Sequence, residues 1–372
     1  MTAPTGTPRW GAALVGAGVP LTTVVGGISL ALRHLRTAER VGWEGLSFVI
    51  PDEAERVQVA NSLQQSCTPE GVQVEFVASE QELPDREIVF VEGSALYKQG
   101  NLSSLALNSA VDGSTKIPAD FRISDLSDIA DATQFLYTQI RKSVEMDGVI
   151  AFYVMRPIAR KITKLLLNTS VSPNQATLGA LACGVSAAIF AALGSPLFAM
   201  FAGLLYWFGG VIDCIDGELA RLRLQSSKFG EWLDSMVDEF STLALIIGIG
   251  VGLTRDGYGA HWQLAALAGA TLAAITLGRM YTHLHKNRLM IDTAQFPWFY
   301  VDAGAPKSPA SLLGKLIAFI GYFVRRDANL TIIAILLIAN MRVVALCTML
   351  AAFCAVTLLL IAHYLIVARR AA

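Results

Sequence analysis

Four aspartates stand close together in the segment DCIDGELARLRLQSSKFGEWLDSMVDE, which interrupts a strongly apolar part of the chain. Asp213 and Asp216 are three positions apart. Asp234 and Asp238 are four apart, so the members of each pair share one face of a helix. A turn between the two helices would bring both faces together. Such oxygen ligands suit hard divalent cations, which neutralise the pyrophosphate of a nucleotide substrate. The segment therefore predicts a metal site for phosphate chemistry.

Small residues accompany these carboxylates at Gly217, Ala220 and Gly230. Without large side chains at these positions, a flat nucleotide and its phosphates can approach the helix backbone. A second interpretation treats the acids as solvated loop residues that are balanced by nearby arginines and a lysine. Aspartates in spanning helices cost about 2.5–3.5 kcal/mol each at the bilayer centre and less toward the interface, and bound metal ions would offset that cost. We therefore favour the metal site.

The helices that position these residues must lie in a membrane. The chain has 372 residues, of which 53% are hydrophobic and only 16% charged, and its mean hydropathy is +0.50. A soluble protein is rarely so apolar, and the long apolar runs begin only after about Ser172. Because about 20 residues cross a 30 Å hydrocarbon core, we predict an α-helical integral membrane bundle of about six transmembrane helices. The predicted spans are residues 175–193, 197–219, 232–253, 262–284, 329–344 and 346–367.

The segment before the first span has a different pattern. Residues 149–168 mix apolar residues with four basic ones at helical spacing, which predicts a helix in the headgroup layer. Residues 311–322 are a second candidate interfacial helix, or part of another span. Lysines and arginines cluster on one side of the predicted spans, so the positive-inside bias places both termini and the aspartates at the cytoplasmic face of the cell membrane. The sequence thus divides into a domain over residues 1–145, a juxtamembrane region over 146–172 and a membrane domain over 173–372.

Strand-like and helical runs alternate in the first domain. The runs AALVG, GLSFVI, VQVEFV and EIVFVEG predict strands, and residues 27–41 and 53–64 predict helices between them. This alternation indicates a parallel, Rossmann-like α/β sheet. A longer helix over residues 125–145 is predicted to lead out of the domain. The domain is expected to remain cytoplasmic, because no charged stretch followed by an apolar signal core precedes it.

Charge and cysteine spacing add two further expectations. The net charge is −1 and no extended basic block is present, so nucleic acid is not an expected partner. The five cysteines have no C-x-x-C spacing, and we expect them to pack as small hydrophobic residues.

The aspartates belong to a longer pattern, D-x-x-D-G-x-x-A-R-x(8)-G-x-x-x-D-x-x-x-D, which this chain matches at every fixed position. The pattern resembles the signature of the CDP-alcohol phosphotransferase family. RPIARKITKLLLNTSVSPNQAT also looks like the entry to that family's first span, and the resemblance covers about residues 149–370. The resemblance implies a six-helix membrane domain, usually a homodimer. It further implies that an acceptor hydroxyl attacks the β-phosphorus of a CDP-alcohol and that CMP leaves.

Residue roles follow from the same resemblance. Asp213, Asp216 and Asp234 would hold Mg²⁺ or Mn²⁺, with two ions per site, and Asp238 would be a second-metal ligand and the general base. The implied CDP-binding residues are Asn174, Thr177, Asp213, Gly217, Ala220, Arg221 and Gly230.

Donor and acceptor are less explicit. The runs GELAR and SKFGEWLD look most like the di-myo-inositol phosphate phosphate synthase branch, which implies CDP-inositol as donor and inositol phosphate as acceptor. Basic residues suit the acceptor phosphate, although snorkelling to lipid headgroups would also explain them. The selected acceptor-binding residues are Arg156, Arg279, Lys286 and Arg288, from a wider set that includes Arg160, Arg325 and Arg326. Phospholipid synthesis from CDP-diacylglycerol stays open as an alternative.

The first domain departs from the enzyme type that it resembles. The domain resembles a sugar-nucleotide nucleotidyltransferase in the segment VPLTTVVGGISLALRHLRTAERVGWEGLSFVIPDE. Residues 15–18, however, lack the basic residue that would hold triphosphate. Glu92 stands near the place where such enzymes have a metal-binding aspartate. We therefore predict a catalytically silent domain. A cation transporter is a remote alternative for the whole chain, because intramembrane aspartates also mark ion paths.

Overall fold

The computed structural model describes residues 10–14, 19–66, 71–83, 88–97, 114–116, 119–140, 147–287, 296 and 326–371. The chain divides into two units, and each is described by itself. The first comprises residues 1–141 with the short segments Leu167–Thr169 and Ala220–Gln225, and the second comprises the remainder. Predictions for residues 15–18 and 311–322, and for Arg288 and Arg325, lie outside the described residues.

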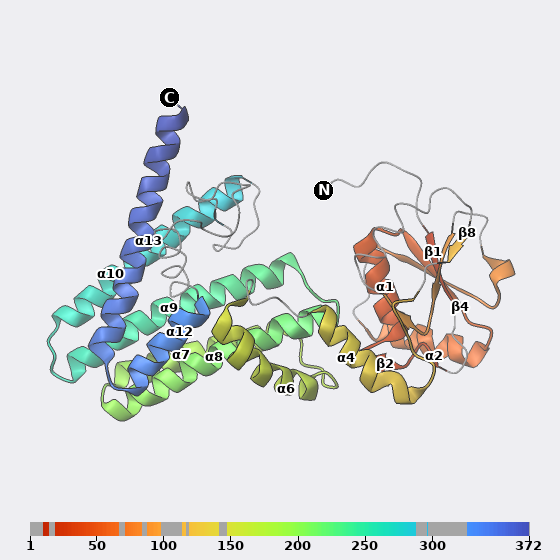
Figure 1. Ribbon diagram of the computed structural model, residues 1–372, viewed down its shortest axis with the longest axis horizontal. Coiled ribbons are helices and arrows are strands. Elements are labelled where there is room, and N and C mark those ends of the chain that lie inside the picture. Colours follow the sequence, from red (N-terminus) through yellow and green to blue (C-terminus); the bar gives the residue numbers. More distant parts are fainter. Residues whose placement is uncertain are drawn as a thin grey trace, which may run out of the picture. The chain divides into compact units, whose positions relative to one another are not determined.

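The first unit contains a five-stranded parallel sheet (Figure 1). Its strands are β1 (Trp10–Leu14), β4 (Gly45–Val49), β5 (Gln73–Val77), β6 (Ile88–Glu92) and β8 (Ser114–Lys116). The spatial order β5-β4-β1-β6-β8 reverses direction at β1, as in doubly wound folds. Every neighbouring pair in this sheet is parallel, which confirms the α/β prediction.

Helices and short strands complete the first unit. The helices are α1 (Leu30–Val41), α2 (Glu53–Gln64) and α4 (Ile129–Gln139), with short 3-10 turns at Glu80–Glu82 and Leu126–Asp128. Two small ribbons pair β2 (Val24–Val25) with β3 (Ile28–Ser29) and β7 (Ala95–Leu96) with β9 (Phe121–Arg122). Helix α1 begins later than predicted because β3 precedes it and the Ser29 side chain caps it by accepting a hydrogen bond from the Leu32 amide.

A buried histidine makes the stability of this unit pH-dependent. The Nε2–H group of His34 donates a 2.8 Å hydrogen bond to the Gly93 carbonyl oxygen. Burial lowers the pKa of His34 from its ordinary 6.5 to about 4. The unfolded chain therefore binds a proton between these values that the folded unit does not, so the free energy of unfolding falls as the pH drops from 6.5 toward 4. The slope from this group is about 1.4 kcal/mol per pH unit at most.

His34→Gln is expected to remove this part of the pH dependence, because an amide can still donate to Gly93 but does not titrate. Hydrogen exchange of α1, measured at pH 7 and pH 5 and corrected for the intrinsic exchange rate, checks the expectation. Wild-type α1 should lose more protection between these pH values than α1 of the variant. Equal losses in the two proteins would contradict the assignment.

The second unit is helical. Its long helices are α7 (Pro173–Leu193), α8 (Pro196–Leu222), α9 (Lys228–Arg255), α10 (His261–Lys286) and α13 (Arg342–Ala371). All five are long and apolar enough to cross a membrane, with residues Arg342–Ile366 meeting the criterion in α13. A π-helical turn, η3 (Ala151–Met155), leads directly into the amphipathic helix α6 (Arg156–Leu166).

The remaining predicted span has different bounds in the structure. Residues 329–344 were expected to form one helix, but α12 (Arg326–Ile338) ends six residues earlier. The chain turns at Asn340, which adopts a left-handed conformation with φ 57°, and α13 then begins. With 13 described residues, α12 is shorter than the roughly 20 that a span requires.

Small residues allow α7 and α9 to pack closely. A Cβ atom at Gly248 would overlap the carbonyl oxygen of Ala188, and one at Gly252 would overlap that of Ala191. Close backbone approach through small residues is the usual way in which helices associate in lipid. This packing fixes α9, which carries Asp234 and Asp238, against the helix that begins at Pro173.

Polar contacts join the connectors at the end of the second unit that lies away from the four aspartates. The backbone N–H of Ser195, between α7 and α8, donates to Asp256 Oδ2 at 2.8 Å. Arg342 at the start of α13 forms an ion pair with the same carboxylate at 2.5 Å. Three connectors thus meet at one end of the unit. The ends of α8 and α9 that carry the four aspartates lie at the other.

Candidate metal and nucleotide site

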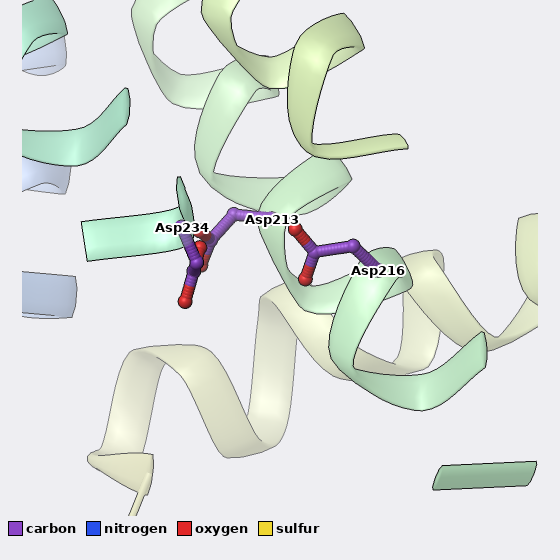
Figure 2. A group of neighbouring side chains, drawn as sticks. All are labelled: Asp213, Asp216 and Asp234. Atoms are coloured by element: carbon purple, nitrogen blue, oxygen red, sulfur yellow. The ribbon is translucent and has the colours of Figure 1, made fainter. Parts of the chain in front are cut away.

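Three of the four aspartates converge, as their spacing predicted. Asp213 and Asp216 lie on the last turns of α8, and Asp234 lies on the second turn of α9. One carboxylate oxygen from each residue lies within 4.8 Å of the others (Figure 2). The short connection between α8 and α9 makes the helices antiparallel neighbours and turns their acidic faces toward each other.

The donor set of this cluster fits a hard divalent cation. All three ligands are carboxylates, and Asp216 is buried. Asp234 Oδ1 is buried with no hydrogen-bond donor among the described residues. Buried acceptors normally have partners, so three convergent carboxylates with an unsatisfied oxygen suit Mg²⁺ or Mn²⁺.

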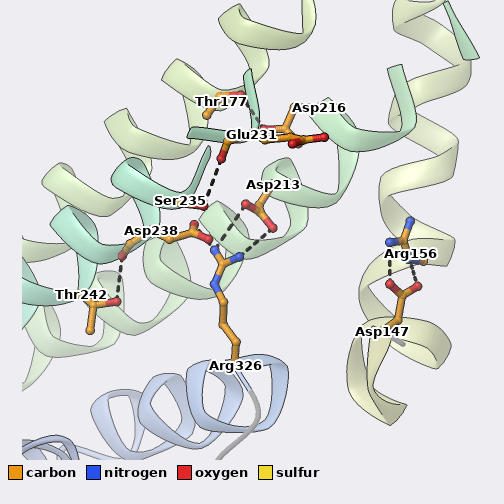
Figure 3. A network of polar contacts seen from close by, with 10 residues as sticks. All are labelled: Asp147, Arg156, Thr177, Asp213, Asp216, Glu231, Ser235, Asp238, Thr242 and Arg326. Carbon is orange, nitrogen blue, oxygen red and sulfur yellow. Dashed lines mark hydrogen bonds and ion pairs between the residues drawn. The ribbon is translucent and has the colours of Figure 1, made fainter. Parts of the chain in front are cut away.

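The fourth aspartate has a protein partner. Asp238 forms an ion pair with Arg326, the first residue of α12 (Figure 3). The same guanidinium group donates to both carboxylate oxygens of Asp213, at 3.2 and 3.3 Å. Arg326 therefore bridges the two acidic helices. Arg326 belongs to the basic residues predicted for this face, but nothing in the sequence places it at the aspartates.

The beginning of α7 contributes the neighbouring polar groups. Thr177 Oγ1 donates to Asp216 Oδ2 at 2.6 Å, and both residues are buried (Figure 3). A Cβ atom built at Gly230 would lie 3.4 Å from Asn174 Oδ1, so α7 and the first turn of α9 lie side by side here. The capping box of Ser172 and Gln175 fixes the start of α7. Asn174 and Thr177, predicted to bind CDP, are thus brought to the acidic cluster.

The other residues that were predicted to bind CDP lie along α8 and α9. Gly217 follows Asp216 directly, and Ala220 and Arg221 continue the last turn of α8. At 100° per residue, Ala220 lies one turn beyond Asp216 on the same side of the helix. The roles of Gly217 and Ala220 in nucleotide binding stay predictions.

The predicted acceptor-binding residues that the structure describes lie on two helices, α6 and α10. Arg156 is buried and forms a bidentate ion pair with Asp147 (Figure 3), and its Nη1 lies 3.6 Å from Glu218 Oε1 on α8. Arg279 and Lys286 are exposed on α10. Arg288 lies outside the described residues.

Two of these ion-pair partners, Asp147 and Glu218, were not singled out in the sequence analysis. Glu218 stands two residues after Asp216, inside the acidic segment, at a position that the signature pattern leaves variable. A carboxylate that is buried in a helix of this kind requires a cationic partner. The sequence indicates that Glu218 needs a cationic partner, but it does not indicate which residue that partner is.

Comparison with known proteins agrees with this geometry. Residues 170–371, just over half of the chain, match the family model described as CDP-alcohol phosphatidyltransferase. The chain is 28% identical over 199 residues to a "Bifunctional IPC transferase and DIPP synthase" of Aquifex aeolicus, and 37% identical over 133 residues to the protein of that name in Thermococcus kodakarensis. It is also 33% identical over 99 residues to an "Archaetidylinositol phosphate synthase" of Pyrococcus horikoshii.

Each alignment covers only part of this chain and part of the relative. The alignments cover 52%, 36% and 27% of this chain. They span 45%, 30% and 50% of the respective relatives. The chain therefore spans half or less of the length of these three relatives.

Proposed function

The chain belongs to the CDP-alcohol phosphatidyltransferase family, and we propose that it transfers a substituted phosphate group from a CDP-alcohol to an acceptor hydroxyl with release of CMP. The convergence of Asp213, Asp216 and Asp234 within 4.8 Å supports this proposal most directly. Phosphoryl transfer depends on positioning and charge neutralisation, and no covalent nucleophile on the protein is required.

Asp213, Asp216 and Asp234 would hold the first divalent ion in this proposal, and Asp238 would contribute to a second. Bound Mg²⁺ or Mn²⁺ would supply neutralisation of the pyrophosphate charge. The nucleotide would lie against Asn174, Thr177, Asp213, Gly217, Ala220, Arg221 and Gly230.

In the proposed transfer step, one phosphorus–oxygen bond forms and another breaks. The acceptor hydroxyl oxygen forms a bond to the β-phosphorus, and the bond from that phosphorus to the bridging oxygen breaks. CMP leaves with the bridging oxygen. Asp238 takes the hydroxyl proton, because a carboxylate near the attacking oxygen is a competent general base.

CDP-inositol and inositol phosphate are the proposed donor and acceptor. Two of the relatives are named bifunctional IPC transferase and DIPP synthase, and a third is named archaetidylinositol phosphate synthase. These names support inositol phosphate chemistry. Arg156, Arg279, Lys286 and Arg288 are the proposed phosphate-binding candidates. Of these, Arg156 has an alternative role, because its guanidinium group pairs with Asp147 and lies near Glu218.

A lipid donor is the second candidate. Archaetidylinositol phosphate is the product named for the relative from Pyrococcus horikoshii, and this favours CDP-diacylglycerol or a similar lipid donor. The two candidates use the same carboxylates and differ in whether the alcohol moiety lies in water or in the bilayer.

The setting of the enzyme forms part of the proposal. We expect a homodimer in the cell membrane with the aspartates and the first unit at the cytoplasmic face, in line with the distribution of basic residues. The first unit is proposed to be catalytically silent. Glu92, near the position of the missing aspartate, accepts a 2.8 Å hydrogen bond from Arg122 Nε, and this pairing supports that view.

A donor and acceptor panel tests the proposal. The purified protein is incubated with CDP-inositol, CDP-diacylglycerol or CDP-ethanolamine and several acceptors, and products are identified by mass. CMP release that depends on Mg²⁺ or Mn²⁺ is expected, with CDP-inositol and inositol phosphate as the preferred pair. Cation flux in vesicles, without CMP release from any donor, would contradict the proposed enzymatic function and would support a transporter.

A further inference from the structure

Two adjacent residues of opposite charge begin α12 and point to different parts of the second unit. Arg326 reaches Asp213 and Asp238, as described above. Asp327 is buried, and its Oδ2 accepts hydrogen bonds from the backbone N–H groups of Ile150 at 3.1 Å and Ala151 at 3.2 Å. One short segment thus contacts both the acidic cluster and the chain that precedes α6.

The contact made by Asp327 is a helix cap supplied from a distant part of the sequence. The first N–H groups of a helix have no partner within the helix, and a carboxylate there is stabilised by the helix dipole. Gly148, with φ 93°, lies directly against this carboxylate, and a Cβ atom at that position would overlap it. The local backbone is therefore shaped to receive Asp327.

The capped segment is itself attached to α8. Asp147 pairs with Arg156, and Arg156 lies 3.6 Å from Glu218, two residues after Asp216. The segment from Asp147 to Arg156 is thus a fixed support beside the acidic cluster. Anything bound to it has a defined position relative to the aspartates.

We propose that Asp327 is a positioning residue, which anchors the start of α12 to this support and so holds the Arg326 guanidinium group against Asp213 and Asp238. Arg326 needs such help, because 49% of its side chain is exposed and a long flexible side chain loses entropy when it is held in one place. Fixing its backbone reduces the number of conformations that it can sample.

The arrangement has a consequence for metal binding. The Asp213 oxygens that accept the N–H groups of Arg326 are also proposed metal ligands, so guanidinium and a divalent ion compete for them. A well-positioned Arg326 should weaken the binding of metal alone. The effect of Asp327 on turnover rests on the proposed function, whereas its effect on metal binding does not.

The test compares Arg326→Ala, Asp327→Ala and the double variant as full-length proteins in detergent. Binding of Mn²⁺ alone is measured by electron paramagnetic resonance of the free ion. We expect Arg326→Ala to tighten Mn²⁺ binding about tenfold, from the loss of a competing charge. Asp327→Ala should tighten it severalfold, and the double variant should match Arg326→Ala because the two residues act through one contact.

Thr331→Val is the matched control, since Thr331 lies on the next turn and its hydroxyl donates to the Asp327 carbonyl oxygen within the same helix. It should leave Mn²⁺ binding unchanged. If Asp327→Ala does not fold, Asp327→Asn replaces it, because the amide removes the charge and preserves the shape.

Additive effects of Arg326→Ala and Asp327→Ala would overturn the proposal, as would Mn²⁺ binding that is unchanged by either substitution. The expected Mn²⁺ results combined with no CMP release from any donor would instead count against the proposed function alone.

Discussion

Asp238→Asn is expected to reduce CMP release by about 10²–10⁴-fold while the protein stays folded, which is the range that a general base contributes. Asparagine has nearly the same shape as aspartate but does not accept a proton at neutral pH. Asp238 lies on the third turn of α9, and its side chain is 18% exposed, so the carboxylate is accessible to a substrate hydroxyl. The substitution therefore removes the proposed proton acceptor with little change in packing.

The measurement is CMP release at saturating donor, acceptor and Mg²⁺, together with thermal unfolding and size-exclusion chromatography. Glu231→Gln is the matched control, because it neutralises an exposed carboxylate on the first turn of the same helix. The control should retain turnover. Wild-type turnover in Asp238→Asn would exclude Asp238 as the general base.

Removal of a metal ligand should have an effect of similar size. Asp234→Ala is expected to lower turnover on the order of 10³-fold, because metal ions supply several kcal/mol of charge stabilisation in the transition state. Asp234 is one of the three clustered carboxylates, and its Oδ1 has no donor among the residues that the structure describes. Chelation with EDTA should likewise stop wild-type CMP release, and Mg²⁺ or Mn²⁺ should restore it.

Thermal unfolding separates loss of metal from loss of fold. In EDTA, Asp234→Ala should unfold at or above the wild-type temperature, because one of several mutually repelling carboxylates is gone. Mn²⁺ should raise the unfolding temperature of the wild type but not that of the variant. Ser235→Ala is the control, since the Ser235 hydroxyl donates to the Glu231 carbonyl oxygen outside the cluster. An equal Mn²⁺ shift in Asp234→Ala would rule out Asp234 as a ligand.

The spacing of the aspartates was sufficient to predict their convergence. Helical periodicity places Asp213 and Asp216 on one face of α8. The short connection to α9 makes the two helices neighbours and so brings Asp234 toward that face. The structure confirms this for the three residues within 4.8 Å. Asp238 stays a predicted ligand and base, and its partner in the structure is Arg326.

The first unit was predictable for a similar reason. Alternating strands and helices of this length permit only parallel pairing, and the observed registers agree. The start of α1 was not placed correctly, because the two-residue ribbon of β2 and β3 is too short to have a hydrophobic period. The end of α12 was misplaced because the apolar run continues through the turn at Asn340.

The partner of Arg156 could not be predicted from the sequence. A basic residue in an amphipathic segment is equally consistent with lipid headgroups, with a bound phosphate and with a buried ion pair. The structure pairs Arg156 with Asp147 and leaves it 3.6 Å from Glu218. Nothing in the spacing of these three residues distinguishes a paired arginine from one that binds a ligand.

By itself, the sequence determined which residues can carry the chemistry, on which helix faces they lie and that these helices are apolar enough for a membrane. These properties are local, because they depend on side-chain type and on the 3.6-residue period. Only the tertiary structure decided that Arg326 bridges Asp213 and Asp238 and that Asp327 caps the chain at Ile150. Those contacts join residues that are 88, 113 and 177 positions apart. A contact between residues so far apart in the chain leaves no periodic pattern in the sequence.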